Sequence, residues 1–186
     1  MPSQSLRCSA VTTDDVQVGK LATEHLIKLG HRKIGHLRGP DVSTALKRLE
    51  GYREALSKAK LKPLVHDCGF TESDGYTAMQ KWIAAGNVPS AIFAANDPAA
   101  IGAMAAASEA GLSVPDDVAF VGAGSIHYGD MLRVPLTTVS WSKAEMGQIA
   151  ARLLLELVDG KKKVRTVTVP PELLIRRSCG AATIRG

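Results

Sequence analysis

Polar and aromatic side chains recur just beyond the ends of several apolar segments of this chain. They are a carboxylate, a guanidinium, an aromatic ring and an amide, at Asp14, Arg48, Phe70 and Asn96. A sugar or nucleobase pocket uses such groups, because polar side chains bond hydroxyls in pairs while a ring covers an apolar face. Three of them also have a specific structural explanation: a surface ion pair for Arg48, the core for Phe70 and a turn for Asn96. The sequence predicts a small-molecule site, with these structural roles as the alternative.

Motifs that would indicate catalysis are incomplete. Gly122-Ala-Gly124 follows an apolar segment, but His127 stands where a dinucleotide-binding motif needs its third glycine. Ser125 lacks the flanking glycines of a nucleophile elbow. The five histidines show no metal-ligand spacing, and there is no Gly-x-x-x-x-Gly-Lys motif for phosphate. We therefore predict a protein that is not an enzyme and needs no cofactor or metal.

The segment 89–104 shows how one of these side chains is positioned. The apolar run 91–95 has the length of a buried strand, and an alanine-rich helical pattern begins directly after Asn96. Asp97 suits the N-cap of that helix and Pro98 its first position, where a missing N–H costs nothing. Asn96 is then at the carboxyl end of a strand, which is the edge where open α/β sheets bind ligands.

Apolar strands and amphipathic helices alternate along most of the chain. Strands are expected to begin near Lys33, Leu64, Ala91 and Val118, at intervals of ~25–30 residues, which is the spacing of βαβ units. This predicts an α/β fold with a Rossmann-like parallel sheet flanked by helices. The pattern changes after Gly122. There we expect an extended segment at 136–141, a helix at 143–159, an edge strand at 164–169 and a last strand near 173–175.

Composition narrows the class of protein. With 186 residues, 45% apolar and 22% charged, the chain can form one domain or two small lobes around a packed core. The net charge of +5 does not indicate nucleic-acid binding, because the dense basic run, Lys161–Lys163 with Arg165 nearby, reads as a solvated turn. Aromatic residues, at 4%, are too few for base stacking.

Cysteine usage and hydropathy bear on the compartment. Cys8, Cys68 and Cys179 are scattered and form no Cys-x-x-Cys pair, as is typical of a reducing environment. Neither a secretory signal nor an apolar run of ~20 residues is present, so we expect a cytoplasmic protein with no membrane partner.

Several longer motifs carry a family resemblance. They occupy residues 22–34, 48–55, 91–97, 111–118, 135–139, 145–147 and 174–178. On these motifs the chain resembles the effector-binding domain of LacI/GalR transcription repressors from about Val11 to Ser178. The resemblance implies the fold of periplasmic sugar-binding proteins, in which two Rossmann-like lobes close on a ligand.

The resemblance also implies a division of the chain. Residues 31–140, with 171–178 adding a strand, match the complete C-terminal lobe. Residues 7–30 and 141–170 match a remnant of the N-terminal lobe, without the helix-turn-helix head, the hinge helix and most of that lobe. We therefore expect DNA binding only through a head that this chain does not contain.

Site residues and partners follow from the same resemblance. Asp14, Arg48, Phe70 and Asn96 align with effector contacts, and Trp141 aligns with a contact that is commonly polar in the family. Gly124 stands where the family usually has an aspartate that grips the effector.

The implied partners are a sugar or nucleobase-like effector and a second copy of the chain, which would pair through 99–110 and 130–134. The alternatives are a periplasmic-type sugar-binding protein for transport and a ligand-free dimerisation module.

Overall fold

The computed structural model describes residues 8–160 and 164–181 and divides into two compact units. The larger unit comprises Asp15–Ser140 and Glu172–Gly186, and the smaller one Met1–Asp14 and Trp141–Pro171. The basic run Lys161–Lys163 and Arg7, the first residue assigned to the N-terminal lobe remnant, lie outside the described residues.

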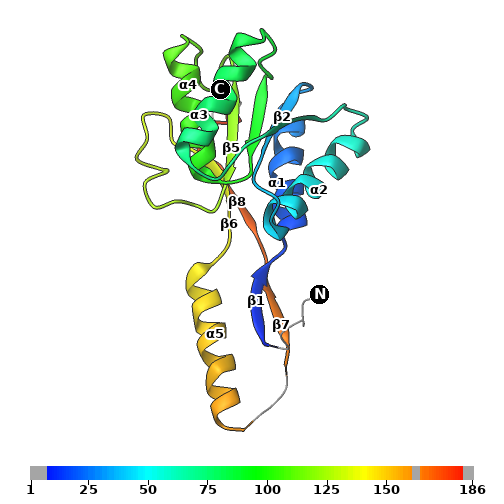
Figure 1. The fold of residues 1–186 in the computed structure, drawn as a ribbon, viewed down its shortest axis with the longest axis vertical. Coiled ribbons are helices and arrows are strands. Elements are labelled where there is room, and N and C mark those ends of the chain that lie inside the picture. Colours follow the sequence, from blue (N-terminus) through cyan, green and yellow to red (C-terminus); the bar gives the residue numbers. More distant parts are fainter. Residues whose placement is uncertain (1–7, 161–163, 182–186) are drawn as a thin grey trace. The chain divides into compact units, whose positions relative to one another are not determined.

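A six-stranded sheet forms the centre of the larger unit (Figure 1). Its order is β3-β2-β4-β5-β6-β8, and the first five strands in that order are parallel. The antiparallel strand β8 pairs with β6 at one edge. The prediction that the strands near residues 33, 64, 91 and 118 are parallel neighbours in one sheet is therefore confirmed. The strands are β2 (Ile34–Arg38), β3 (Leu64–Asp67), β4 (Ala91–Ala94), β5 (Ala119–Ala123), β6 (Thr137–Ser140) and β8 (Glu172–Leu174).

Four helices cover the two faces of this sheet. Helices α1 (Asp15–Lys28) and α2 (Ser43–Lys58) lie together on one face, and α3 (Glu72–Ala84) and α4 (Asp97–Glu109) on the other (Figure 1). All four residues of the central strand β4 are buried, as expected for a parallel strand covered on both sides. The expected lobes differ from this division at residues 15–30, because α1 packs against α2 and so belongs to the larger unit.

Each helix pair approaches closely through glycines. A Cβ on Gly51 of α2 would lie 2.0 Å from the Val16 carbonyl oxygen of α1. In the other pair, a Cβ on Gly102 of α4 would lie 1.8 Å from the Glu72 carbonyl oxygen of α3. These distances leave no room for a methyl group, so the glycines set the separation of the helices.

Replacing Gly102 with alanine is expected to destabilise the protein despite alanine's better helix propensity. Overpacking against a backbone carbonyl should lower the free energy of unfolding by about 1–3 kcal/mol net. Gly147→Ala is the matched control, because a Cβ at this helical position has nothing within 4 Å. It should leave stability unchanged or raise it by up to ~1 kcal/mol. Urea unfolding followed by far-UV circular dichroism measures both, and equal stability of the two variants would contradict the close-packing argument.

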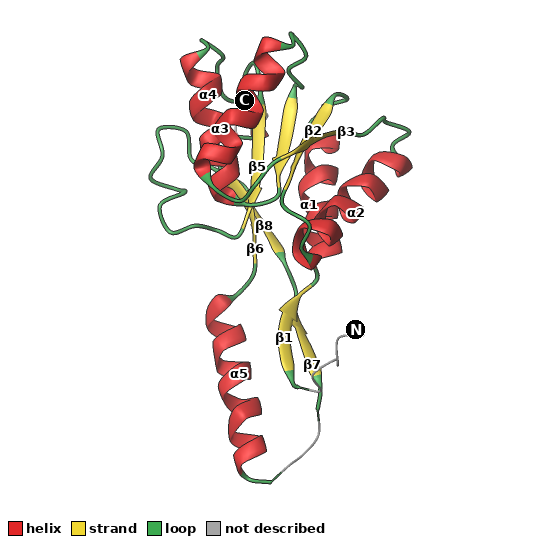
Figure 2. Ribbon diagram, viewed as in Figure 1, coloured by secondary structure: helices red, strands yellow, loops and turns green. Residues whose placement is uncertain are grey.

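The smaller unit is a two-stranded parallel sheet with one helix (Figure 2). Strand β1 (Ala10–Thr13) pairs with β7 (Thr166–Val169), and the Ser142 hydroxyl caps α5 (Lys143–Val158) by accepting from the Glu145 N–H. Leu153 is the one buried residue of α5, whereas Leu154, Leu155 and Val158 are exposed. This helix therefore presents an apolar surface that its own two strands do not cover.

Candidate functional site

Arg48 lies at the carboxyl end of the central strand. Its Nη1 donates to the carbonyl oxygen of Ala95, the residue after β4, over 2.6 Å. Its Nε and Nη2 both bond Asp15 Oδ1, at 2.9 and 2.8 Å. Both residues are buried, so this is an internal ion pair and not the surface pair considered as the structural alternative.

Asn96 follows Ala95 in the chain and connects this strand end to the loop after β3. Its Oδ1 accepts from the Ala99 N–H at 3.1 Å, and its Nδ2 donates to the Phe70 carbonyl oxygen at 2.7 Å. Asn96 is therefore the N-cap of α4, and the prediction that Asp97 occupies the N-cap is wrong. The cap moves one residue upstream because Asn96 keeps extended dihedral angles while Asp97 is already helical.

Phe70 follows β3, in the loop before α3. Its half-buried ring lies against Gly39 in the loop after β2, where an added Cβ would be 2.2 Å from Phe70 Cε1. The Phe70 carbonyl accepts from Asn96. The structure thus brings Arg48, Phe70 and Asn96 together at the carboxyl ends of β2, β3 and β4.

Asp14 and Trp141 belong to the smaller unit. Asp14 is exposed and directly precedes α1, and the half-buried Trp141 directly follows β6. Each is therefore one residue along the chain from the larger unit. Their membership of the site stays a prediction.

Asp97 shapes the loop after β5 in a way that the sequence analysis missed. Its Oδ1 accepts from the Thr138 hydroxyl at 2.6 Å, and its Oδ2 accepts from the Ile126 N–H at 2.7 Å. A Cβ on Gly122 would lie 2.2 Å from Asp97 Oδ1, so only glycine admits this carboxylate. A glycine inside an apolar strand often marks such a close approach, and Gly122 was the available signal. The loop continues through Gly124, at φ +122°.

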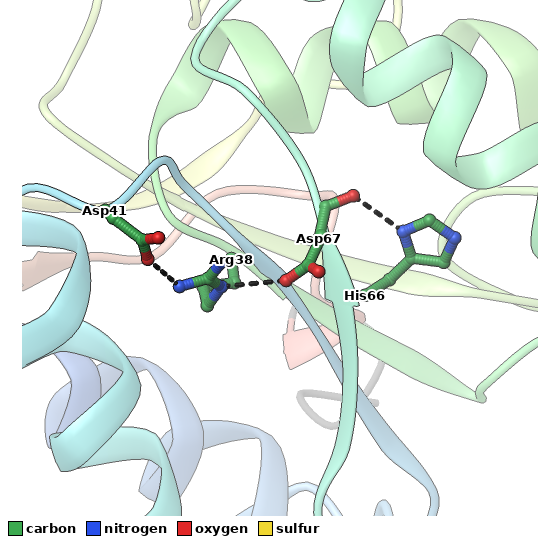
Figure 3. Close-up of polar contacts among 4 residues, drawn as sticks. All are labelled: Arg38, Asp41, His66 and Asp67. Atoms are coloured by element: carbon green, nitrogen blue, oxygen red, sulfur yellow. Dashed lines mark hydrogen bonds and ion pairs between the residues drawn. The ribbon is translucent and has the colours of Figure 1, made fainter.

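A second ion cluster lies at the ends of β2 and β3, and Figure 3 shows its residues. Arg38 Nε donates to Asp67 Oδ1 at 2.9 Å, and Arg38 Nη1 also bonds Asp41. His66 Nδ1 donates to the Asp67 carbonyl oxygen at 2.8 Å. Arg38 and Asp67 are paired in the β2–β3 register, so this cluster occupies the same edge of the sheet as Arg48. Arg38, Asp41 and Asp67 were not among the predicted site residues.

The cysteines in the larger unit do not resemble activated nucleophiles. Burial, reinforced by the nearby Asp74 carboxylate, raises the pKa of the Cys68 thiol to about 11. Cys179 Sγ lies 3.2 Å from His25 Nε2, but Cys179 is buried and also accepts from the Thr137 hydroxyl. Because a thiolate is the reactive species, the raised pKa of Cys68 does not suit covalent catalysis, and the Cys179 side chain is closed to solvent.

The described part of the chain lacks two other kinds of feature, a cluster of metal ligands and a membrane-spanning helix. It contains no group of three or more His, Cys, Asp or Glu side chains that could hold a metal ion. No helix within 8–160 or 164–181 is long and apolar enough to cross a bilayer.

Comparison with known proteins defines the class. Residues 23–179 match the family described as periplasmic binding protein-like domain. The transcription regulator CelR in complex with cellobiose aligns with a TM-score of 0.87 at 33% identity, covering 92% of this chain and 54% of that one. The chain therefore belongs to the periplasmic binding protein-like domain family, of the kind found in LacI/GalR regulators.

The relatives within that class are repressors. The chain is 38% identical over 168 residues to the HTH-type transcriptional repressor PurR of Haemophilus influenzae, covering 86% of this chain and 50% of PurR. It also aligns with the lac repressor dimer bound to operator and the anti-inducer ONPF, with a TM-score of 0.86 at 29% identity, covering 95% of this chain and 54% of that chain. The resemblance to LacI/GalR repressors is confirmed. The chain spans about half the length of these relatives.

Proposed function

We propose that this chain binds a small-molecule effector, a sugar or nucleobase-like compound, and that in the intact protein this binding controls attachment to DNA. The observation that carries the proposal is the arrangement at one edge of the sheet, where Arg48 bonds the Ala95 carbonyl and the adjacent Asn96 bonds the Phe70 carbonyl. This edge is the general ligand site of open α/β sheets. A relative with the same fold was solved with cellobiose, which is consistent with a sugar-like effector.

Control of DNA binding requires two states of the intact protein. An effector shifts their populations only by as much as its affinity differs between them. Asp14 and Trp141, which belong to the smaller unit, are further proposed effector contacts. DNA recognition itself is assigned to a helix-turn-helix head outside this sequence, and no catalytic role is proposed.

Phe70 offers the clearest binding test, because its side chain makes none of the hydrogen bonds that hold this edge together. A panel of ribose, cellobiose, lactose, adenine and hypoxanthine is screened by thermal shift, and the strongest binder is measured by calorimetry. Phe70→Ala should lower the affinity for that compound by about 5–30-fold, because roughly 1–2 kcal/mol of apolar contact with the ring is lost.

Tyr76→Ala is the matched aromatic control for this test. Tyr76 lies on α3 and its hydroxyl bonds Glu109 at the end of α4, away from the strand ends. This variant should bind like the wild type. An equal loss of affinity in both variants, or no loss of affinity in Phe70→Ala, would mean that the compound binds away from Phe70.

We further propose that the chain forms a homodimer through α4 and the loop at 130–134. These segments line a groove of about 530 Å³, whose apolar residues include Met104, Leu112, Leu132 and Val134. Met131, in the same loop, is largely exposed. A second copy is the proposed occupant, and a LacI-family relative was solved as a dimer.

Ala105→Arg tests the dimer, because Ala105 is exposed on α4 within this groove. Introducing a charged side chain at the contact should raise the dimer dissociation constant by at least ~10-fold, since an uncompensated buried charge opposes association. Ala84→Arg, at an exposed position on α3 outside the groove, should sediment like the wild type. A wild-type chain that sediments as a monomer at micromolar concentration would contradict the proposal.

A further inference from the structure

The charges at the proposed effector site indicate which ligands it accepts, and this inference rests on the proposed function. Two arginines lie at the carboxyl edge of the sheet, and each is bonded to aspartate. An arginine at a ligand site would ordinarily favour a phosphate or a carboxylate, which its planar fork binds well. Here the fold itself supplies the carboxylates.

Arg48 and Asp15 form a closed pair. Their side chains are 8% and 10% exposed, and two guanidinium nitrogens bond the same carboxylate oxygen. The third nitrogen bonds the Ala95 carbonyl. An anion approaching this guanidinium would also approach Asp15, whose repulsion offsets the attraction at nearly the same distance. A hydroxyl group can accept from the guanidinium side and donate to the carboxylate side, so an ion pair does not disfavour it.

The outer cluster adds negative charge to the same edge. Arg38 bonds both Asp41 and Asp67, whose side chains are 77% and 83% exposed. One guanidinium thus faces two carboxylates that are open to solvent. Together the two clusters contain three carboxylates and two guanidinium groups, so the charges of their own side chains sum to −1 and disfavour an anion.

We propose that the effector is an uncharged molecule and that Asp15 is the residue that excludes anionic ligands from the site. Neutral sugars and neutral nucleobases fit this description, whereas sugar phosphates and nucleotides do not. Asn96 and the Phe70 ring are themselves uncharged, so the remaining proposed contacts on the larger unit agree with this class.

Asp15→Asn tests the inference directly, because it removes the charge while keeping the size and an oxygen that can accept from Arg48. The probes are inorganic phosphate, ribose and ribose 5-phosphate, measured by calorimetry on the full chain at low salt. The wild type should show no saturable phosphate binding and should bind ribose 5-phosphate no better than ribose. Asp15→Asn should gain at least ~10-fold in affinity for phosphate and ribose 5-phosphate.

Two further variants serve as a charge control and as an independent test of the outer cluster. Glu54→Gln removes an acidic charge of the surface pair Lys20–Glu54 and should bind phosphate like the wild type. Asp41→Asn combined with Asp67→Asn carries little folding risk, because both side chains are exposed, and it should also raise phosphate affinity. The inference is overturned if the wild type prefers ribose 5-phosphate to ribose. It is also overturned if Asp15→Asn folds like the wild type and gains no phosphate affinity, whatever the double variant does.

These outcomes are separable from the failure of the proposed function. If the wild type binds no neutral compound of the panel, the effector function loses its support. A gain of phosphate binding in Asp15→Asn would still establish that Asp15 excludes anions. Conversely, tight binding of a phosphorylated sugar by the wild type supports the effector function and refutes its restriction to uncharged ligands.

Discussion

Arg48→Ala is expected to lower the free energy of unfolding by about 3–5 kcal/mol, because it leaves the Asp15 carboxylate buried without its cation. It also removes the donor to the Ala95 carbonyl, which lies at the end of the central strand. Urea unfolding at pH 7 measures the loss. Because the folded state itself is weakened, a drop in ligand affinity in this variant would not by itself identify Arg48 as a ligand contact.

A paired substitution separates the charge from the packing. Arg48→Met combined with Asp15→Leu replaces both charges with apolar side chains, and such replacements are often neutral or stabilising. The double variant should therefore recover most of the stability that Arg48→Ala loses. A loss below ~1 kcal/mol in Arg48→Ala would mean that solvent compensates Asp15, as it does in exposed pairs.

His36 is expected to make the protein sensitive to acid above the range in which carboxylates titrate. Its ring is fully buried and stacks between Tyr52 and Phe93, with centroids 5.0 and 4.7 Å away. Nδ1 bonds the Phe93 carbonyl at 2.9 Å, so Nδ1 carries the hydrogen, and within the described residues Nε2 has no hydrogen-bond partner. A proton on Nε2 would therefore create a buried charge with no acceptor.

The direction of the pH effect follows from the pKa values. Burial lowers the pKa of His36 from 6.5 to about 4, with smaller contributions from Arg38, Arg53 and Arg48, while its bond to Phe93 acts in the opposite direction. Between these two values the unfolded chain binds a proton that the folded chain does not. Stability should be constant with respect to this group above pH 6.5 and should fall by roughly 3 kcal/mol as the pH drops to about 4.

His36→Leu isolates this contribution, because leucine occupies a similar volume and does not titrate. The free energy of unfolding in urea is measured for wild type and variant at pH 7, 6, 5 and 4. Subtracting one from the other at each pH cancels the contributions of the other titrating groups. His127→Leu, at an exposed position, should keep the wild-type dependence. Parallel pH profiles for wild type and His36→Leu would refute the role assigned to His36.

The topology of the larger unit was predictable because its signals are local. Buried parallel strands are continuous apolar runs, and β4 and β5 stand out for that reason. The placement of Asn96 at a strand end follows from the same runs. The site residues carried over from the family include three, Arg48, Phe70 and Asn96, that the fold brings to one edge.

Other features depend on contacts between distant residues. Asp15 and Asp97 are ordinary acidic residues in the sequence, and their roles emerge only when Arg48 and Thr138 are brought beside them. The assignment of α1 likewise depends on its packing against α2, through Gly19 and Gly51, which no local pattern reveals. The N-cap of α4 was predicted one residue too late, at Asp97 instead of Asn96, because both residue types are good N-caps.

The antiparallel pairing of β6 with β8 has a consequence for how the chain can be taken apart. Ser140 and Glu172 are directly opposite each other in that pairing, although 31 residues, Trp141–Pro171, separate them along the chain. In topological terms this segment is an insertion between the two strands of a hairpin. A two-residue Asn-Gly turn is the usual connection of such a hairpin and could replace the whole segment. The larger unit would then be one uninterrupted polypeptide from Asp15 onward, and its ability to fold without its companion would become directly measurable.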